Sequence, residues 1–158
     1  MKQFLIFASL IVILCIGCSK KEEGCTPVTP LAEEPQILAY ANANGITAVK
    51  HTNGIYYQII DSGTGATPAL NSNIYITYTA KLLNGTQFDQ STNADSTGWM
   101  LGSLIEGWQI GLPLIKKGGR IKLLIPSSLA YSCNGKGSAI PPNSVLYFDI
   151  TLVDVTQG

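Results

Sequence analysis

The stretch that most constrains the fold is a short amphipathic segment near the middle of the chain, LIEGWQIGLPLI (104–115). Its apolar residues recur at helical i, i+3, i+4 and i+7 spacing, which predicts a helix with one apolar face. Pro113 limits this helix to roughly two turns. Because so short a helix is not stable alone in water, it must be wrapped by other elements, with Trp108 facing into them.

Two glycines, Gly107 and Gly111, lie on this predicted helix. Each costs about 1 kcal/mol relative to alanine in a helix interior, so a packing reason is expected at both positions. We therefore predict that a neighbouring element approaches too closely to leave room for a side chain. Taken alone, Trp108 is best explained as an ordinary core residue, and only the rest of the sequence favours a binding role.

Charge and composition exclude several classes of function. The 158 residues include ten basic and ten acidic side chains, and no basic stripe or acidic tract is present. Nucleic-acid binding therefore has no electrostatic support. His51 is the only histidine, and no clustered carboxylates accompany it. A metal site or a Ser/His/Asp triad is disfavoured, and we expect no cofactor.

The N-terminus is typical of an export signal. Lys2 precedes a thirteen-residue apolar run (4–16), followed by Gly17 and Cys18. Such a run suits a signal peptide and is too short to span a bilayer as a helix. A small residue before cysteine at this place resembles the lipobox of bacterial lipoproteins. That resemblance implies a signal peptide over 1–17, acylation of Cys18, and a lipid-anchored protein of the cell envelope, periplasmic or surface-facing. An ordinary secretory signal and an uncleaved anchor remain as alternatives.

The region after the signal is predicted to contain little structure. Residues 18–35 are polar and proline-containing, which favours a flexible tether. Residues 36–53 are interpreted as an N-terminal extension whose one helix (36–43) ends at Asn44-Gly45. Cys25 and Cys133 are available for a disulfide in an oxidising compartment. The bridge would contribute about 4 kcal/mol in the chain-entropy model, but the sequence leaves their proximity open.

From residue 54 onward the pattern is that of β-strands. Asn73 to Leu83 alternates in polarity and runs into Asn84-Gly85, a strong hairpin signal. The final strand alternates in the same way, with Phe148 on one face and Tyr147 on the other. The remaining strands are predicted over 54–63, 86–89, 99–101 and 120–125. The fold class is therefore α+β, with a curved antiparallel sheet of five or six strands wrapped around one short central helix.

Several sequence blocks occur together in an order that resembles one family. These are YTAKLLNGTQFD (78–89), WMLG (99–102), LIEGWQIGLPLIKKGGR (104–120), IPSSLAY (125–131) and IPPNSVLYFDI (140–150). In this combination residues 54–158 resemble an FKBP-type peptidyl-prolyl cis-trans isomerase domain. The resemblance covers about two thirds of the chain. It implies an FKBP-like fold and a monomeric protein. It also implies that proline-containing polypeptides are the substrates and that macrolide-type inhibitors are ligands.

The resemblance also implies the residues of the pocket. All but one are aromatic or aliphatic: Tyr78, Phe88, Asp89, Trp99, Leu104, Ile105, Trp108, Tyr131, Ile140 and Phe148. Trp108 would form the floor under the proline ring and Tyr131 would supply a hydroxyl. The family often pairs its acid with a nearby arginine, whereas residues 91–96 contain none. The polar partner of Asp89 is therefore left open.

The reaction implied by this resemblance needs neither a nucleophile nor a metal. Rotation about an X–Pro bond is opposed by amide resonance, and an apolar pocket can favour the twisted amide. The leading hypothesis is an isomerase acting on envelope or surface proteins as they fold. The alternative is a non-catalytic module, anchored at the membrane, that binds proline peptides or acts as a chaperone. An adhesin that uses the loops 90–97 and 132–139 is a weaker third possibility.

Overall fold

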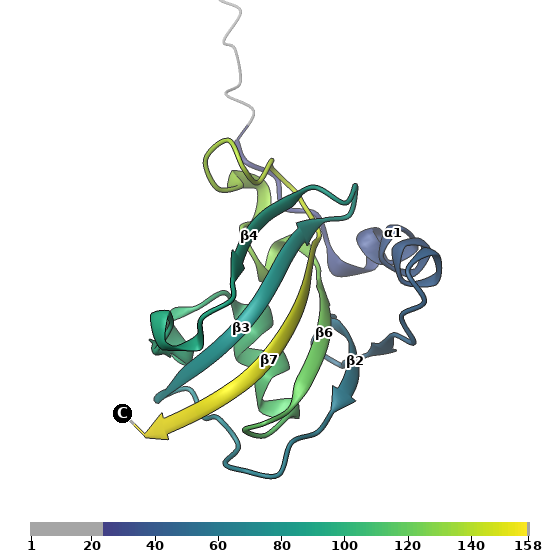
Figure 1. Ribbon diagram of the computed structural model, residues 1–158. Coiled ribbons are helices and arrows are strands. Elements are labelled where there is room, and N and C mark those ends of the chain that lie inside the picture. The colour runs from purple at the N-terminus through teal and green to yellow at the C-terminus, as the bar shows by residue number, and fades with distance from the viewer. Residues whose placement is uncertain (1–23, 158) are drawn as a thin grey trace, which may run out of the picture.

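The structure is a computed structural model in which residues 24–157 are described. One antiparallel sheet dominates it, in the spatial order β1-β2-β6-β7-β3-β4, with β5 paired to β3. Figure 1 shows the long strands side by side in a twisted sheet, with helical segments behind it. The strands are β1 (Val49–Lys50), β2 (Tyr56–Asp61), β3 (Ser72–Leu82), β4 (Gln87–Ser91), β5 (Trp99–Met100), β6 (Arg120–Ile125) and β7 (Leu146–Gln157).

The predicted fold class is confirmed, although the sheet has seven strands rather than five or six. The additional strand is β1, which pairs with β2 through Val49 and Tyr57. The sequence predicts only a connection there, because two residues are too few to show an alternating pattern. The predicted signal peptide (1–17) and the acylation site Cys18 lie outside the described residues.

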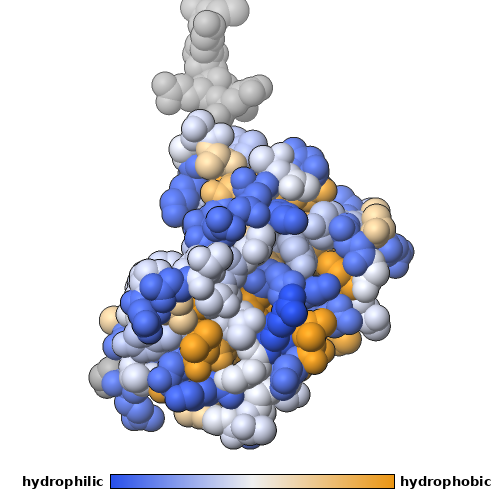
Figure 2. All heavy atoms as spheres, viewed as in Figure 1, coloured by the Kyte–Doolittle hydropathy of each residue, from blue (hydrophilic) through white to orange (hydrophobic). Residues whose placement is uncertain are grey.

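The alternation in the two longest strands decides which face of the sheet is covered. In β3 the buried residues include Ile74, Ile76 and Tyr78, and the residues between them are partly exposed. In β7, Leu146, Phe148 and Ile150 point into the core beneath the sheet. Figure 2 shows the opposite face, where hydrophilic and intermediate side chains surround separate hydrophobic patches.

The helix α2 (Glu106–Gly111) lies against the inner face of the sheet and continues into a 3-10 turn, η3 (Leu112–Leu114). It ends where Pro113 was expected to limit it. A Cβ at Gly107 would overlap Ile125 Cγ2, and one at Gly111 would lie 2.7 Å from Leu123 Cδ1. The two glycines thus allow strand β6 to pack directly on the helix.

A second helix, α1 (Pro30–Ala43), packs on the other face of the sheet. Its Ile37 and Ala41 form a separate core with Leu124 and Tyr147. This helix begins at Pro30 rather than at Gln36, so the last six residues of the predicted tether are helical instead.

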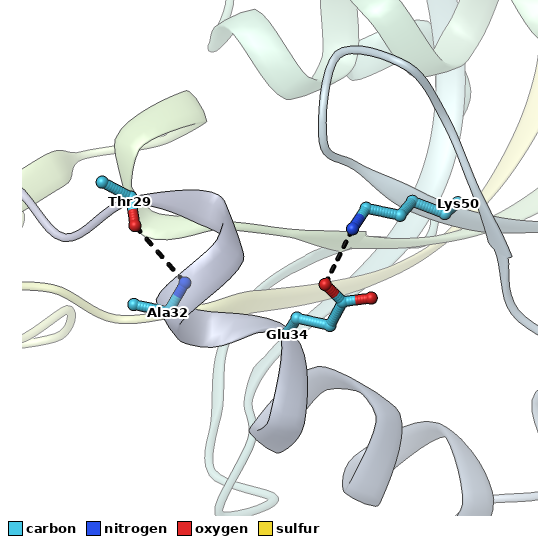
Figure 3. A network of polar contacts seen from close by, with 4 residues as sticks. All are labelled: Thr29, Ala32, Glu34 and Lys50. Carbon is cyan, nitrogen blue, oxygen red and sulfur yellow. Dashed lines mark hydrogen bonds and ion pairs between the residues drawn. The ribbon is translucent and has the colours of Figure 1, made fainter.

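Local chemistry explains the earlier start of α1. Thr29 caps the helix by accepting a hydrogen bond from the Ala32 N–H at its hydroxyl oxygen (Figure 3). Pro30 occupies the first helical position, where the missing N–H has no intrahelical partner. Among the described residues, no helix has the length and apolar character needed to cross a membrane.

Candidate active site

A pocket of about 490 Å³ opens beside α2 on the inner side of the sheet. Nine of the ten residues implied by the family resemblance line it. They come from four strands (β3, β4, β5 and β7), the α2 region and the loop between β6 and β7: Tyr78, Phe88, Asp89, Trp99, Leu104, Ile105, Trp108, Tyr131 and Phe148. Residues far apart in the sequence therefore converge on one hollow.

Five aromatic rings form a connected series around this pocket. Trp108 lies at its centre, with its ring centroid 5.3 Å from that of Tyr78 and 5.1 Å from that of Phe148. Trp99 packs beside Tyr78 at 6.2 Å, and Phe88 beside Phe148 at 6.0 Å. All four contacts are edge-to-face, the arrangement that aromatic quadrupoles favour. These five rings give the pocket an apolar floor and apolar side walls.

The carboxylate of Asp89 is held at the pocket wall. Its Oδ2 accepts a hydrogen bond from the Tyr78 hydroxyl over 2.8 Å, and its Oδ1 accepts one from the Gln90 N–H over 2.8 Å. Burial, together with the adjacent Asp89, raises the pKa of Tyr78 well above the ordinary value for tyrosine. Tyr78 therefore remains protonated at neutral pH and keeps donating to Asp89.

The wall opposite the strands is provided by the loop between β6 and β7. The hydroxyl oxygen of Tyr131 accepts a hydrogen bond from Lys136 Nζ over 3.3 Å. The same ammonium group lies 5.1 Å from the centroid of the Tyr131 ring. Because its oxygen is used as an acceptor here, the Tyr131 hydroxyl can direct its own proton elsewhere, including toward a molecule in the pocket.

Ile140 is the one implied residue that does not line the pocket. Its side chain is 3% exposed and packs within the central core. Its backbone pairs with that of Lys136 in an isolated β-bridge, with reciprocal N–H to C=O hydrogen bonds. Ile140 therefore anchors the loop between β6 and β7 in the core and does not contact the pocket.

The pocket also has polar residues at its rim that sequence reasoning missed: Gln90, Ser91, Ser96, Ser103 and Lys136. Ser91 and Ser96 contact each other through their hydroxyls at 3.2 Å. The only signal available for them was their place in polar or glycine-rich loops. Within residues 24–157 no three His, Cys, Asp or Glu side chains gather in a way that could hold a metal ion.

Comparison with known proteins identifies the domain. The family model described as "FKBP-type peptidyl-prolyl cis-trans isomerase" matches residues 65–153, which include every residue lining the pocket. This chain belongs to the FKBP family. The helix α1 and the strands β1 and β2 of this FKBP-type chain precede the matched range.

Two curated relatives illustrate the similarity. FkpA of Escherichia coli (strain K12), an FKBP-type peptidyl-prolyl cis-trans isomerase, is 42% identical over 105 residues, which are 66% of this chain and 38% of FkpA. The peptidyl-prolyl cis-trans isomerase Mip of Coxiella burnetii is 34% identical over 127 residues, or 80% of this chain and 55% of Mip. The FKBP-type chain thus spans between about two fifths and just over half of the length of these two relatives.

Solved structures agree with this assignment. The crystal structure of FkpA from Escherichia coli has a TM-score of 0.68 at 34% identity, covering 81% of this chain and 61% of that one. A peptidyl-prolyl cis-trans isomerase from Pseudomonas syringae pv. tomato has a TM-score of 0.68 at 30% identity, covering 84% of this chain and 99% of that one. Both identities exceed the level at which only the fold would be shared.

Proposed function

We propose that this FKBP-type chain catalyses the cis-trans isomerisation of X–Pro bonds in polypeptides. One observation carries the proposal: five aromatic rings meet around a hollow of about 490 Å³. A hollow of this kind can enclose a proline ring and exclude water from the peptide bond that precedes it. The family membership and the names of the relatives support the same reaction.

The mechanism follows from the origin of the barrier. Amide resonance imposes about 18–20 kcal/mol on rotation, and uncatalysed isomerisation takes tens to hundreds of seconds. Reaching the millisecond range requires a reduction of roughly 5–7 kcal/mol. The planar amide carries separated charge and is well solvated by water, whereas the twisted amide is not. The apolar box around Trp108 withdraws that solvation and so favours the twisted form.

Two donors are positioned to hold a substrate carbonyl. The Ile105 N–H, just before α2, donates to no acceptor within residues 24–157, so it is free to bind a carbonyl oxygen. The Tyr131 hydroxyl is the second donor, since its oxygen already accepts from Lys136. Asp89 orients Tyr78 and shapes the local field. No step requires it to remove a proton.

A protease-coupled assay on a peptide with a cis X–Pro bond tests this proposal. Phe148→Ala opens the pocket wall and should abolish most of the acceleration, as should Trp108→Ala. The matched control is Tyr147→Ala, because Tyr147 is the next residue on β7, is also buried, and packs in the core on the opposite face. Equal loss in both β7 variants would show that the loss does not depend on the pocket side of the sheet, and would count against the proposed site.

The same assay addresses the non-catalytic alternative. A proline peptide that binds but is not isomerised would show a proline-binding module. A macrolide-type inhibitor should compete with the peptide if both occupy the aromatic pocket. We further propose that the domain acts as a monomer, which sedimentation analysis of the purified protein checks.

We propose in addition that the protein is exported and anchored by lipid at Cys18. The support is the signal-like sequence of residues 1–18 and the disulfide between Cys25 and Cys133, a bond typical of oxidising compartments. Folding envelope or surface proteins would then be the clients. Labelling of cells with a palmitate analogue should mark the wild type and not Cys18→Ser. Equal labelling of the wild type and of Cys18→Ser would count against acylation at Cys18.

A further inference from the structure

The first described residues of the chain run beside the loop that joins β6 to β7, residues 126–145 (Figure 1). Three separate contacts connect them. Cys25 forms a disulfide with Cys133. The carbonyl of Thr26 accepts a hydrogen bond from Asn143 Nδ2 over 3.4 Å. We call residues 25–33 the strap and residues 126–145 the pocket loop.

The third contact is a buried hydrogen bond. Glu33 is 2% exposed, and its Oε2 accepts a hydrogen bond from the Ser127 N–H over 2.8 Å. A buried polar group is costly unless it is hydrogen-bonded. Oε2 of Glu33 meets this need at the backbone where the pocket loop starts, whereas Oε1 has no partner among the described residues. Removing the acceptor would leave the Ser127 N–H unpaired in the interior, which is unfavourable.

The strap contacts the pocket loop on both sides of Tyr131 in the sequence. Tyr131 lies between Ser127, which Glu33 holds, and Cys133, which is bonded to Cys25. The turn from Tyr131 is tight, since its carbonyl accepts from the Gly135 N–H over 3.1 Å. Movement of Cys133 would therefore move Tyr131 and the adjacent Lys136, both of which line the pocket.

We propose that the strap is a positioning element of the active site, in which the Cys25–Cys133 disulfide and Glu33 hold the Tyr131 hydroxyl at the pocket. The inference rests on the proposed isomerase function and extends the site to a segment that precedes the family-matched residues. The aromatic floor is built from strands and α2, which the strap does not touch through these contacts. Loss of the strap should therefore lower kcat more than it raises KM.

The disulfide provides the most direct test, because it can be opened without changing the sequence. A dithiol such as dithiothreitol gives two electrons and two protons to the S–S bond, yielding two cysteine thiols and the cyclic disulfide of the reagent. Cys25 is exposed and thus accessible to it. We expect kcat of the full-length protein to fall about fivefold or more on reduction, since small misplacement of a catalytic group is costly.

The control for the reagent is Cys25→Ser/Cys133→Ser, which keeps Cys15 and Cys18. Its kcat should match that of the reduced wild type and should not change with dithiothreitol. An unchanged kcat on reduction of the wild type would overturn the proposal. It would also be overturned if dithiothreitol lowered the kcat of the double variant as much as that of the wild type. Hydrogen exchange of residues 127–136 should accelerate on reduction while that of β7 stays constant. This readout is independent of turnover, so it separates failure of the strap from absence of isomerase activity.

Glu33 has a matched control in the next residue of the same helix. Glu34 forms an ion pair with Lys50 of β1 at 2.7 Å (Figure 3) and has no contact of this kind with the pocket loop. Glu33→Met should lower kcat, whereas Glu33→Gln, which keeps an acceptor, should restore most of it. Glu34→Gln should leave kcat unchanged. Equal effects of Glu33→Met and Glu34→Gln would reduce the strap to a general stabilising element and refute the positioning role.

Discussion

The hydroxyl of Tyr78 donates a hydrogen bond to Asp89 Oδ2 over 2.8 Å. The carboxylate in the pocket is therefore held by a tyrosine on the neighbouring strand, through the β3–β4 pairing that places Asp89 opposite Ala80. The loop 91–96, which contains no arginine, is not needed to fix it. This contact makes Asp89 part of the pocket wall and not a free base.

Asp89→Asn tests that role. Asparagine keeps an oxygen acceptor for Tyr78, so kcat/KM should fall by at most about tenfold. A tenfold change corresponds to about 1.4 kcal/mol, which is the net contribution of one or two hydrogen bonds. The pH profile of the wild type should be flat between about 6 and 9, because the raised pKa of Tyr78 keeps its hydroxyl protonated there. A loss of several orders of magnitude, or a profile governed by one carboxylate, would instead identify Asp89 as a base.

Lys136 should act through Tyr131. Its ammonium donates to the hydroxyl oxygen over 3.3 Å, which makes the hydroxyl a better donor to a substrate carbonyl. Lys136→Met should reduce kcat modestly, and Tyr131→Phe should reduce it more. In the Tyr131→Phe background the lysine substitution should have no further effect, which a double-mutant cycle measures. A full additional loss would show that Lys136 contacts the substrate directly.

The close approach of α2 to β6 predicts an order of stabilities. Gly107→Ala should destabilise the fold by about 1–3 kcal/mol, the usual range for overpacking, because the new methyl overlaps the branched Cβ substituents of Ile125. Gly111→Ala should be milder, since it meets the flexible end of Leu123. Gly24→Ala, with nothing within 4 Å, is the control. Urea unfolding measures all three, and a reversed order of the two helix variants would contradict this account.

Burial raises the pKa of Tyr147 above the ordinary value for tyrosine. The folded protein then keeps this proton while the unfolded chain releases it above pH about 10. The contribution to stability is fully present below that pH and is lost as pH rises further. Tyr147→Phe should make the alkaline decline shallower by at most about 1.4 kcal/mol per pH unit. Urea midpoints between pH 8 and 11 would check this, and identical slopes would refute it.

Local periodicity was sufficient to predict the main elements around the site. The alternation of Ile74, Ile76 and Tyr78 is confirmed as the buried face of β3. The two glycines of the central helix correctly indicated an element packed against it. Such signals are readable because the period of a strand or helix assigns each side chain to a face before any partner is known.

Other features depended on contacts between distant parts of the chain. The sequence predicted a tether through residue 35, but burial of Ile37 and Glu33 against the sheet and pocket loop sustains a helix from Pro30. Ile140 faces the core, where it packs in one cluster with buried side chains from strands and α2 that are distant from it in the sequence. The Cys25–Cys133 bond joins residues separated by 108 positions.

By itself the sequence determined the sheet faces and the short central helix, because these follow from side-chain type and local spacing. Its resemblance to the FKBP family implied the set of aromatic residues. The tertiary structure alone decided that five rings meet in one pocket, that Tyr78 holds Asp89, and that the N-terminal strap bonds to the pocket loop. These are pairings between distant segments, and their geometry is fixed only when the whole sheet closes over α2.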